Sequence, residues 1–249
     1  MTASATDSIP SSIPGQLAAV RARILAATRA AGRPPDAVAL IAVSKHQDAA
    51  AVRAAWGAGQ RAFGESYVQE ALDKQAALTE LTIEWHFIGR VQANKTRSIA
   101  EHFDWVHGLA DPGHARRLSE QRPAARGPLK VCLQVNTSGE ASKGGVPPAG
   151  VAQLLAVCGA LPGLQVMGLM TLPAPDADPG LQRVPLRALR LLRDRLATPQ
   201  CPLECLSMGM SDDLEAAVLE GATLVRIGTA IFGARPYNNN QAGAADSAT

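Results

Sequence analysis

The sequence has few cysteines, few aromatic residues and no large excess of charge of either sign. Its four cysteines among 249 residues form no CxxC pair, so they suggest neither a disulfide scaffold nor a zinc motif. The 24 Lys and Arg residues nearly balance the 22 Asp and Glu residues, unlike a nucleic-acid-binding chain. No apolar run reaches the roughly 18 residues of a membrane-spanning helix. We therefore expect no nucleic-acid or membrane partner and no metal ion.

The two ends of the chain are polar. Residues 1–14 are rich in Ser, Thr, Ala and Pro and contain no apolar segment of the secretory kind. Residues 238–249 are also polar or small. We expect both segments to be mobile tails around one domain that covers residues 15–237. Because no export signal is predicted, the expected location is the cytoplasm.

Between these ends, short apolar runs alternate eight times with helix-type patterns. The runs cover residues 38–43, 61–63, 83–88, 105–109, 129–135, 164–169, 203–206 and 223–227. This alternation in one domain predicts a (β/α)8 TIM barrel. An open doubly wound sheet is the alternative, but it favours a glycine-rich GxGxxG turn after the first strand. The first run ends instead in Ser44-Lys45-His46, so the barrel is preferred.

Polar residues and glycines lie at or just beyond the ends of the apolar runs. Because the carboxyl ends of barrel strands meet on one face, these residues are expected to share a site. They are Lys45, Glu65, Ser66, His86, Gly89, His107, Asn136, Thr171, Ser207, Gly209, Arg226 and Gly228. The Arg-rich helix pattern over 181–196 is instead typical of a solvated face, and the glycine-rich loop 139–145 has the composition of a lid.

Lys45 follows the first apolar run with one residue between them. At the mouth of a barrel its amine would be partly desolvated, which favours the neutral, nucleophilic form. Such an amine suits imine formation with an aldehyde or ketone. The alternative is a surface lysine that only marks the end of a strand.

The last two loops have the composition of a phosphate site. Gly209 and Gly228 let the backbone approach an anion, and Ser207, Ser211 and Thr229 can add hydroxyl donors. Ordinary capping of the next helix by Ser211 is the alternative, and Asp212 and Asp213 would repel phosphate unless they point away. An imine-forming lysine opposite a phosphate cradle suggests pyridoxal 5′-phosphate, which carries both an aldehyde and a phosphate.

Six blocks of the sequence resemble the pyridoxal phosphate homeostasis protein family, whose fold is similar to the barrel domain of alanine racemase. The blocks are Ala42–Lys45, Phe63–Glu70, His86–Gly89, Gly168–Thr171, Ser207–Asp212 and Arg226–Gly233, within a match from about residue 17 to residue 237. Gln92 and Asn94-Lys95 after the third block, and Val135-Asn136 with Glu140 and Lys143, also fit the family. Ser66 stands where the family usually has Asn, and His46-Gln47 also departs from the common pattern.

The resemblance implies roles for individual residues. Lys45 would hold pyridoxal phosphate as an internal aldimine, and Arg226 would contact the pyridine nitrogen. The residues around the phosphate would be Ser207, Gly209, Ser211, Gly228 and Thr229. The remaining pocket residues would be Ser66, His86, Asn136, Met170 and Thr171. Without the resemblance, Arg226 could equally form a salt bridge inside the barrel with a carboxylate such as Glu65.

These roles favour a carrier over an enzyme. Arginine only donates hydrogen bonds, so a pyridine nitrogen beside Arg226 stays unprotonated and withdraws electrons poorly. A racemase of this kind takes a second base from a further domain, for which we expect no room before residue 249. We expect a monomer or weak dimer that stores pyridoxal phosphate, delivers it to apoenzymes and limits free aldehyde, without robust turnover. A weak racemase or lyase, with His86 or His107 as base, and a plain interaction domain are the alternatives.

Overall fold

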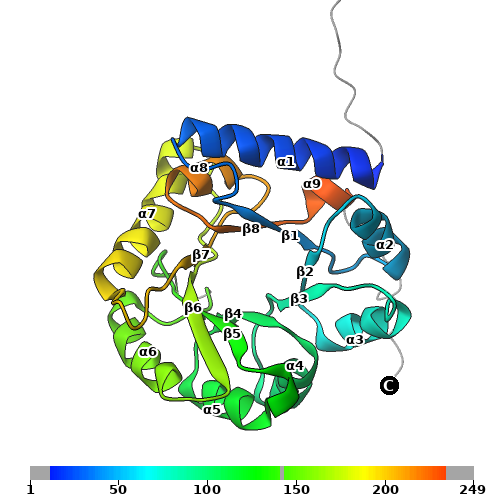
Figure 1. The fold of residues 1–249 in the computed structure, drawn as a ribbon. Coiled ribbons are helices and arrows are strands. Elements are labelled where there is room, and N and C mark those ends of the chain that lie inside the picture. Colours follow the sequence, from blue (N-terminus) through cyan, green and yellow to red (C-terminus); the bar gives the residue numbers. More distant parts are fainter. Residues whose placement is uncertain (1–11, 141–142, 234–249) are drawn as a thin grey trace, which may run out of the picture.

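The computed structural model describes residues 12–140 and 143–233. Its eight strands form one closed parallel barrel in chain order, which confirms the predicted fold (Figure 1). The strands are β1 (Ala39–Val43), β2 (Ala62–Glu65), β3 (Glu84–Phe87), β4 (Trp105–Leu109), β5 (Leu129–Gln134), β6 (Leu164–Met170), β7 (Cys205–Ser207) and β8 (Leu224–Ile227). Strand β1 pairs with both β2 and β8, so the open-sheet alternative is wrong.

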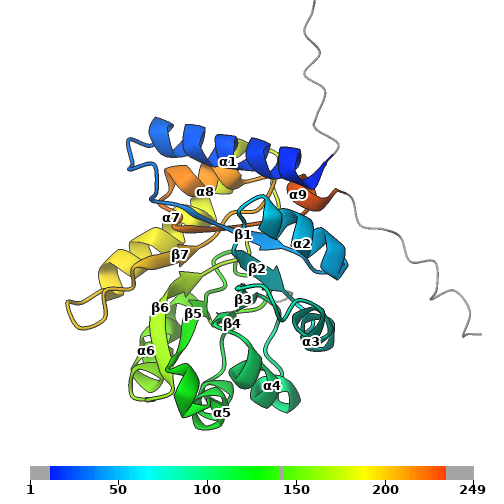
Figure 2. The ribbon, with the colours of Figure 1, turned by 45° about the vertical axis from the view of Figure 1, so that its right-hand side comes forward.

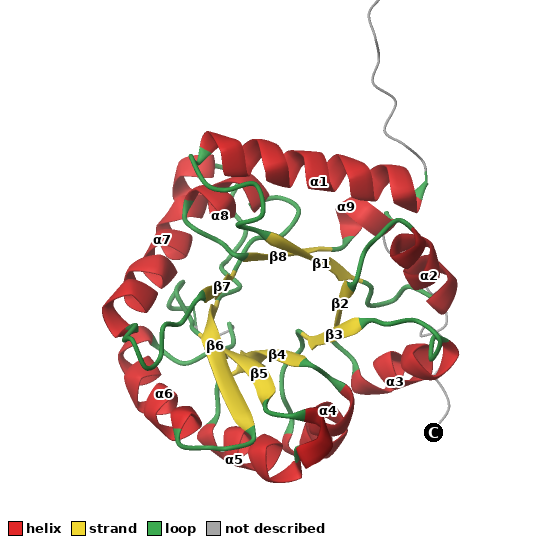
Figure 3. Ribbon diagram, in the orientation of Figure 1, coloured by secondary structure: helices red, strands yellow, loops and turns green. Residues whose placement is uncertain are grey.

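Helices surround the strands as an outer ring (Figure 3). They are α1 (Ile13–Ala30), α2 (Ala49–Gly57), α3 (Val68–Ala77), α4 (Thr96–His102), α5 (Pro112–Gln121), α6 (Val151–Gly159), α7 (Pro179–Leu196), α8 (Leu214–Leu219) and α9 (Thr229–Phe232). The long helix α1 lies against α8 and α9, which come from the other end of the sequence (Figure 2). Within the described ranges, no helix is both long and apolar enough to cross a membrane.

The first helix begins earlier than its sequence pattern suggests. The side chain of Ser12 accepts a hydrogen bond from the Gly15 amide and caps α1, whose first turn contains Pro14. Ile13 and Pro14 therefore belong to the helix, with Ser12 as its N-cap, and not to the predicted tail. The rest of that tail, residues 1–11, and the predicted tail at 238–249 lie outside the described residues.

Two apolar regions hold the barrel together. The larger one fills the space between the strands and the helices. The smaller one lies inside the barrel and consists of Ile41, Trp105, Cys132, Met170 and Leu224. Side chains along a strand alternate between these two regions, because successive residues point to opposite faces. A residue two positions after an interior one therefore faces the barrel axis nearer its mouth.

Helix α7 carries arginines that are bonded to a buried carboxylate. Arg183, Arg187 and Arg190 reach Glu220 at 2.6, 3.0 and 3.2 Å, and the Glu220 side chain is 1% exposed. Burial alone would raise the pKa of Glu220, but the hydrogen bonds from the arginines outweigh it and lower the pKa. The solvated face predicted for α7 therefore serves in part to bind the C-terminal end of α8.

Candidate functional site

A cavity of about 230 Å³ opens at the carboxyl ends of the strands. Its lining is Val43, Lys45, Ser66, Ile88, Leu172, Met210, Ser211, Asp212, Arg226, Gly228 and Thr229. These residues come from the exits of β1, β2, β3, β6, β7 and β8, so the barrel gathers distant parts of the sequence. The volume is below the roughly 300–1,000 Å³ of pockets for drug-sized ligands. The cavity therefore suits one small ring with short substituents.

Lys45 enters this cavity because of the strand alternation. Val43 and Lys45 are two positions apart and both line the cavity, whereas Ser44 between them is fully buried on the other side. The Ser44 hydroxyl donates to Glu65 Oε1 at 2.6 Å. Lys45 is thus a half-buried residue of the barrel mouth and not an exposed lysine at a strand end.

A buried charge cluster supports the segment around Lys45. The ammonium group of Lys74, on α3, donates to Ser44 O at 2.6 Å, to Glu65 Oε1 at 2.8 Å and to Glu70 Oε1 at 2.7 Å. Glu70 Oε1 also accepts the His46 amide at 2.5 Å, and His46 has a positive φ of 64°. This backbone strain directly after Lys45 is held by the cluster.

Glu65 is the least solvated member of that cluster. Its side chain is fully buried, and its second oxygen, Oε2, has no hydrogen-bond partner among the described residues. Burial raises the pKa of Glu65, while the charge and hydrogen bond of Lys74 act in the opposite direction. Glu65 therefore depends on Lys74 to remain ionised.

Arg226 reaches the cavity from β8 and is only 4% exposed. Its Nη1 donates to Ser207 Oγ at 2.6 Å, and its Nη2 donates to Thr171 O at 3.0 Å. Burial lowers the pKa of Arg226 to about 10, which still leaves it a cation at neutral pH. Glu65 pairs with Lys74 instead, so the alternative salt bridge between Arg226 and Glu65 is wrong.

The loop after β7 turns tightly beside the cavity. Gly209 has a φ of 98°, and a Cβ at this position would lie 2.6 Å from Ala217 Cβ, so the loop requires glycine. Asp213 Oδ1 accepts the Met210 amide at 2.6 Å, which directs this carboxylate into its own loop. Asp212 does line the cavity, and the repulsion expected from it remains.

Ser211 and Thr229 are among the residues that line the cavity. No described residue hydrogen-bonds to either hydroxyl, and helix α8 has no side-chain cap. The alternative in which Ser211 caps that helix is therefore wrong. Both hydroxyls and the adjoining Gly228 remain available to an anion.

Several predicted site residues lie away from the cavity. Asn136 donates to Glu140 O at 2.8 Å and so shapes the predicted lid loop, of which residues 141–142 lie outside the described residues. Thr171 contributes its carbonyl to Arg226, and Met170 is fully buried inside the barrel. Ser207 is below the cavity floor, because its hydroxyl accepts from Arg226.

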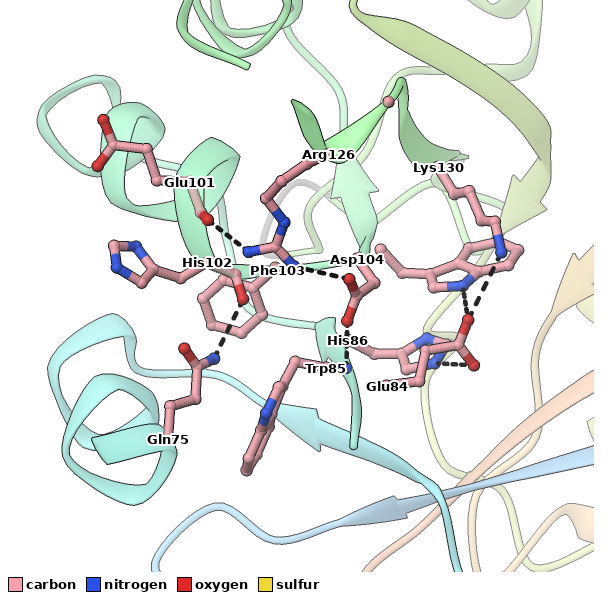
Figure 4. A network of polar contacts seen from close by, with 12 residues as sticks. Gln75, Glu84, Trp85, His86, Glu101, His102, Phe103, Asp104, Arg126 and Lys130 are labelled. Carbon is pink, nitrogen blue, oxygen red and sulfur yellow. Dashed lines mark hydrogen bonds and ion pairs between the residues drawn. The ribbon is translucent and has the colours of Figure 1, made fainter. Parts of the chain in front are cut away.

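His86 and His107 lie deeper in the barrel interior, with His86 Nδ1 2.9 Å from His107 Nε2. Figure 4 shows His86 beside Glu84, which is the first residue of β3. The sequence places His86 at a strand exit, but Ile88, two residues later, is the residue of this strand that lines the cavity. Neither histidine is exposed to a ligand in the cavity.

Four further residues line the cavity that were not predicted from the sequence: Val43, Ile88, Leu172 and Met210. Val43 and Ile88 could have been found from the two-residue alternation that starts at Lys45 and His86. Leu172 and Met210 stand next to predicted residues, but no pattern in the sequence distinguishes them from ordinary loop residues.

Comparisons with known proteins give consistent results. The family defined as "alanine racemase, N-terminal domain" matches residues 16–236. A pyridoxal phosphate homeostasis protein of Pseudomonas aeruginosa is 56% identical over 227 residues, which cover 91% of this chain and 97% of that protein. Its counterpart of the same name in Escherichia coli K12 is 48% identical over 225 residues, which cover 89% and 96%. The solved structure of PipY from Synechococcus elongatus PCC7942 with PLP bound has a TM-score of 0.79 and 39% identity, covering 89% of this chain and 100% of that one.

Proposed function

The chain belongs to the pyridoxal phosphate homeostasis protein family, and from this we propose that it binds pyridoxal 5′-phosphate in order to store and deliver it. The single observation that carries the proposal is the cavity in which Lys45, Arg226 and the β8 loop meet. Its recipients would be apoenzymes that require the same cofactor.

The residues of the cavity fit this cofactor. Gly209 and Gly228 leave no room for side chains, since a Cβ would lie 2.6 Å from Ala217 Cβ and 3.1 Å from Val43 O respectively. Gly228, which lines the cavity, therefore presents backbone without a side chain to a phosphate, whereas Gly209 keeps the adjoining β7 loop close to helix α8. The hydroxyls of Ser211 and Thr229 would add two donors, and the apolar side chain of Ile88 offers a surface for a ring. When bound, the cofactor supplies an aldehyde that reacts with primary amines.

Lys45 would hold the cofactor covalently. Its ε-amine would condense with the aldehyde, forming one C=N bond and releasing one water molecule. The Lys74 cluster would serve this step by fixing the Ser44 carbonyl and the strained His46 backbone on either side of Lys45. Arg226 would donate to the pyridine nitrogen and keep it unprotonated, because a guanidinium has no acceptor site.

The positions of the two histidines and of Arg226 argue for a carrier over the weak racemase or lyase that would use His86 or His107 as its base. An enzyme that moves an α-proton needs a base within hydrogen-bond reach of that proton. His86 and His107 are 1% and 0% exposed and lie outside the cavity, so neither can provide it. Arg226 would further weaken the electron withdrawal on which such chemistry depends.

Absorbance and borohydride trapping test the proposal. The purified protein, titrated with pyridoxal phosphate, should develop the visible band of a protonated lysine imine, and reduction should fix the adduct on Lys45. Lys45→Ala should lose the trapped adduct, while Lys95→Ala, a variant of an exposed lysine outside this cavity, should keep it. A colourless protein, or an adduct that maps to another lysine, would refute the proposal.

Incubation with amino acids separates the carrier from a weak racemase or lyase. The loaded protein should leave D- and L-alanine unchanged over hours, as followed by chiral chromatography. Arg226→Gln should alter the absorbance spectrum and increase side reactions with amino acids. Sustained turnover by the wild type would make the protein an enzyme, and an unchanged Arg226→Gln spectrum would contradict the contact with the ring nitrogen.

A further inference from the structure

A continuous line of polar contacts crosses the barrel interior below the cavity. Arg226 Nη1 lies 2.6 Å from Ser207 Oγ, which lies 2.7 Å from His107 Nδ1. His107 Nε2 lies 2.9 Å from His86 Nδ1, and His86 Nε2 lies 3.3 Å from Glu84 Oε2. We call these five residues the interior column. They come from β8, β7, β4 and β3, so the column connects opposite sides of the barrel.

The column runs from the cavity to the far end of the barrel. Arg226, Ser207, His107 and His86 are between 0% and 4% exposed, whereas the Glu84 side chain is 43% exposed. Glu84 is the first residue of β3 and therefore lies at the end opposite to the cavity. Its Oε1 accepts the Trp105 indole at 2.7 Å, and His86 stacks on the ring of Trp105.

The direction of every hydrogen bond in the column follows from its two ends. Arg226 can only donate, so Ser207 Oγ accepts from it. The hydroxyl proton of Ser207 then has one partner available among the described residues, His107 Nδ1. His107 therefore carries its proton on Nε2 and donates to His86 Nδ1, and His86 carries its own proton on Nε2, toward Glu84.

The opposite arrangement fails at both ends. If His107 donated from Nδ1, the buried Ser207 hydroxyl would have two donors and no acceptor for its own proton. His86 Nε2 would then direct a lone pair at the Glu84 carboxylate. An unsatisfied buried polar group costs about 1–3 kcal/mol, so the first arrangement is preferred. The 3.3 Å contact of His86 Nε2 is loosely aligned, and Nε2 is otherwise without a partner in the described part of the chain.

The charges along the column agree with this direction. Burial lowers the pKa of His86 and, further, that of His107, so both imidazoles are neutral at pH 7. The contact with His86 lowers the pKa of Glu84 to about 2, so Glu84 is an anion. Asp104 and Lys130 also act on His86, with opposite signs. The column thus joins a cation at the cavity to an anion at the far end through two neutral rings.

We propose that His86 and His107 are positioning residues, which hold the Arg226 guanidinium in place at the cavity floor through a one-directional chain of hydrogen bonds. The chain fixes Nη1 on Ser207, while Thr171 O fixes Nη2. The remaining N–H groups of Arg226 are then kept for the cavity. The effect on the cofactor rests on the proposed function, but the direction of the chain does not.

Ring-nitrogen NMR of the ligand-free protein tests the direction. In long-range ¹H–¹⁵N spectra at pH 7, His86 and His107 should both be neutral imidazoles protonated on Nε2. Either ring as an Nδ1-protonated tautomer, or as a cation, would overturn the assignment. The guanidinium resonances of Arg226 should be resolved in the wild type and shifted or broadened by exchange in His107→Leu. Unchanged Arg226 resonances would overturn the positioning role without any cofactor being needed.

Binding of pyridoxal phosphate tests the consequence. His107→Leu should raise the dissociation constant by up to about tenfold, because it removes the hydrogen bond between neutral groups that orients Ser207 toward Arg226, and it should shift the absorbance band. His107→Gln can still donate toward His86 and should recover part of both effects. His114→Gln, on helix α5 outside the column, is the matched control and should match the wild type. Equal affinity and spectrum in His107→Leu and the control would overturn the proposal.

The two measurements can refute the proposed function and the interior column independently of each other. A wild-type protein that does not bind pyridoxal phosphate but shows both predicted tautomers and the Arg226 shift would refute the proposed function and support the column. A wild type that binds through Lys45 but shows the opposite tautomers would retain the function and overturn the column.

Discussion

Removing the ammonium group of Lys74 should strongly destabilise the protein. The Lys74 side chain is 6% exposed, and its three hydrogen bonds go to Ser44 O, Glu65 and Glu70. Lys74→Met keeps a side chain of similar length but leaves the fully buried Glu65 carboxylate without its cation. Breaking a buried ion pair from one side costs about 3–5 kcal/mol, so the free energy of unfolding in urea should fall by about that amount.

The loss should depend on pH in a defined direction. Burial already raises the pKa of Glu65 in the folded state. Protonation of Glu65 therefore adds to the free energy of unfolding below the ordinary pKa of 4.5, and this contribution is lost as pH rises through the folded-state pKa. Without Lys74, which opposes the burial effect, the folded pKa rises further. Protonated Glu65 needs no cation, so Lys74→Met should destabilise less at pH 5 than at pH 8.

Two further variants complete the experiment. Glu65→Gln in the Lys74→Met background removes the stranded charge, so the pair should show a coupling of about 0.5–3 kcal/mol. Lys95→Met changes an exposed lysine and should stay within about 0.5 kcal/mol of the wild type. A loss for Lys74→Met no larger than that of Lys95→Met, or an equal loss at pH 5 and pH 8, would refute the reasoning.

Two predictions concern other parts of the site and the column. Gly209→Ala should lower the free energy of unfolding by about 1–3 kcal/mol, because φ is 98° and the new Cβ would meet Ala217 Cβ at 2.6 Å. The control is Gly159→Ala, where a Cβ meets nothing within 4 Å. Equal urea midpoints for the two variants would contradict the close approach at Gly209. The contact with His86 lowers the pKa of Glu84 to about 2. The ionised Glu84 carboxylate therefore stabilises the folded state above its ordinary pKa of 4.5, and this stabilisation is lost as pH falls toward 2. The difference in urea midpoint between wild type and Glu84→Gln should therefore shrink from pH 6 to pH 3, and a constant difference would show that the carboxylate charge does not contribute.

The barrel could be predicted because its strands are buried on both faces. Such strands form continuous apolar runs, and β4 occupies the residues predicted for it, 105–109. Strand β2 was predicted to end at Phe63 but continues to Glu65. A glutamate in a sequence pattern predicts a solvent-exposed position. Glu65 is instead buried against Lys74, which lies nine residues later in the sequence. The pattern cannot show that pairing, because it depends on how α3 packs over β2.

The candidate site could be predicted in part. Lys45, Ser211, Arg226, Gly228 and Thr229 are together at the cavity, because each follows or ends a strand on the inner side. His86 and Ser207 also point inward, but lie one layer deeper. Depth inside a barrel is set by the stagger between neighbouring strands, and a single sequence does not contain that stagger.

The binding of Glu220 by three arginines has a consequence for mutational tolerance. One acceptor is served by several interchangeable donors, so the loss of any single arginine from α7 leaves two others in contact with the carboxylate. The loss of Glu220 instead removes the shared carboxylate from all three arginines at once, beside the turn that leads into β8, and Arg190 keeps its contact with Asp194 at 3.7 Å. We therefore expect substitutions of a single α7 arginine to be better tolerated than substitutions of Glu220.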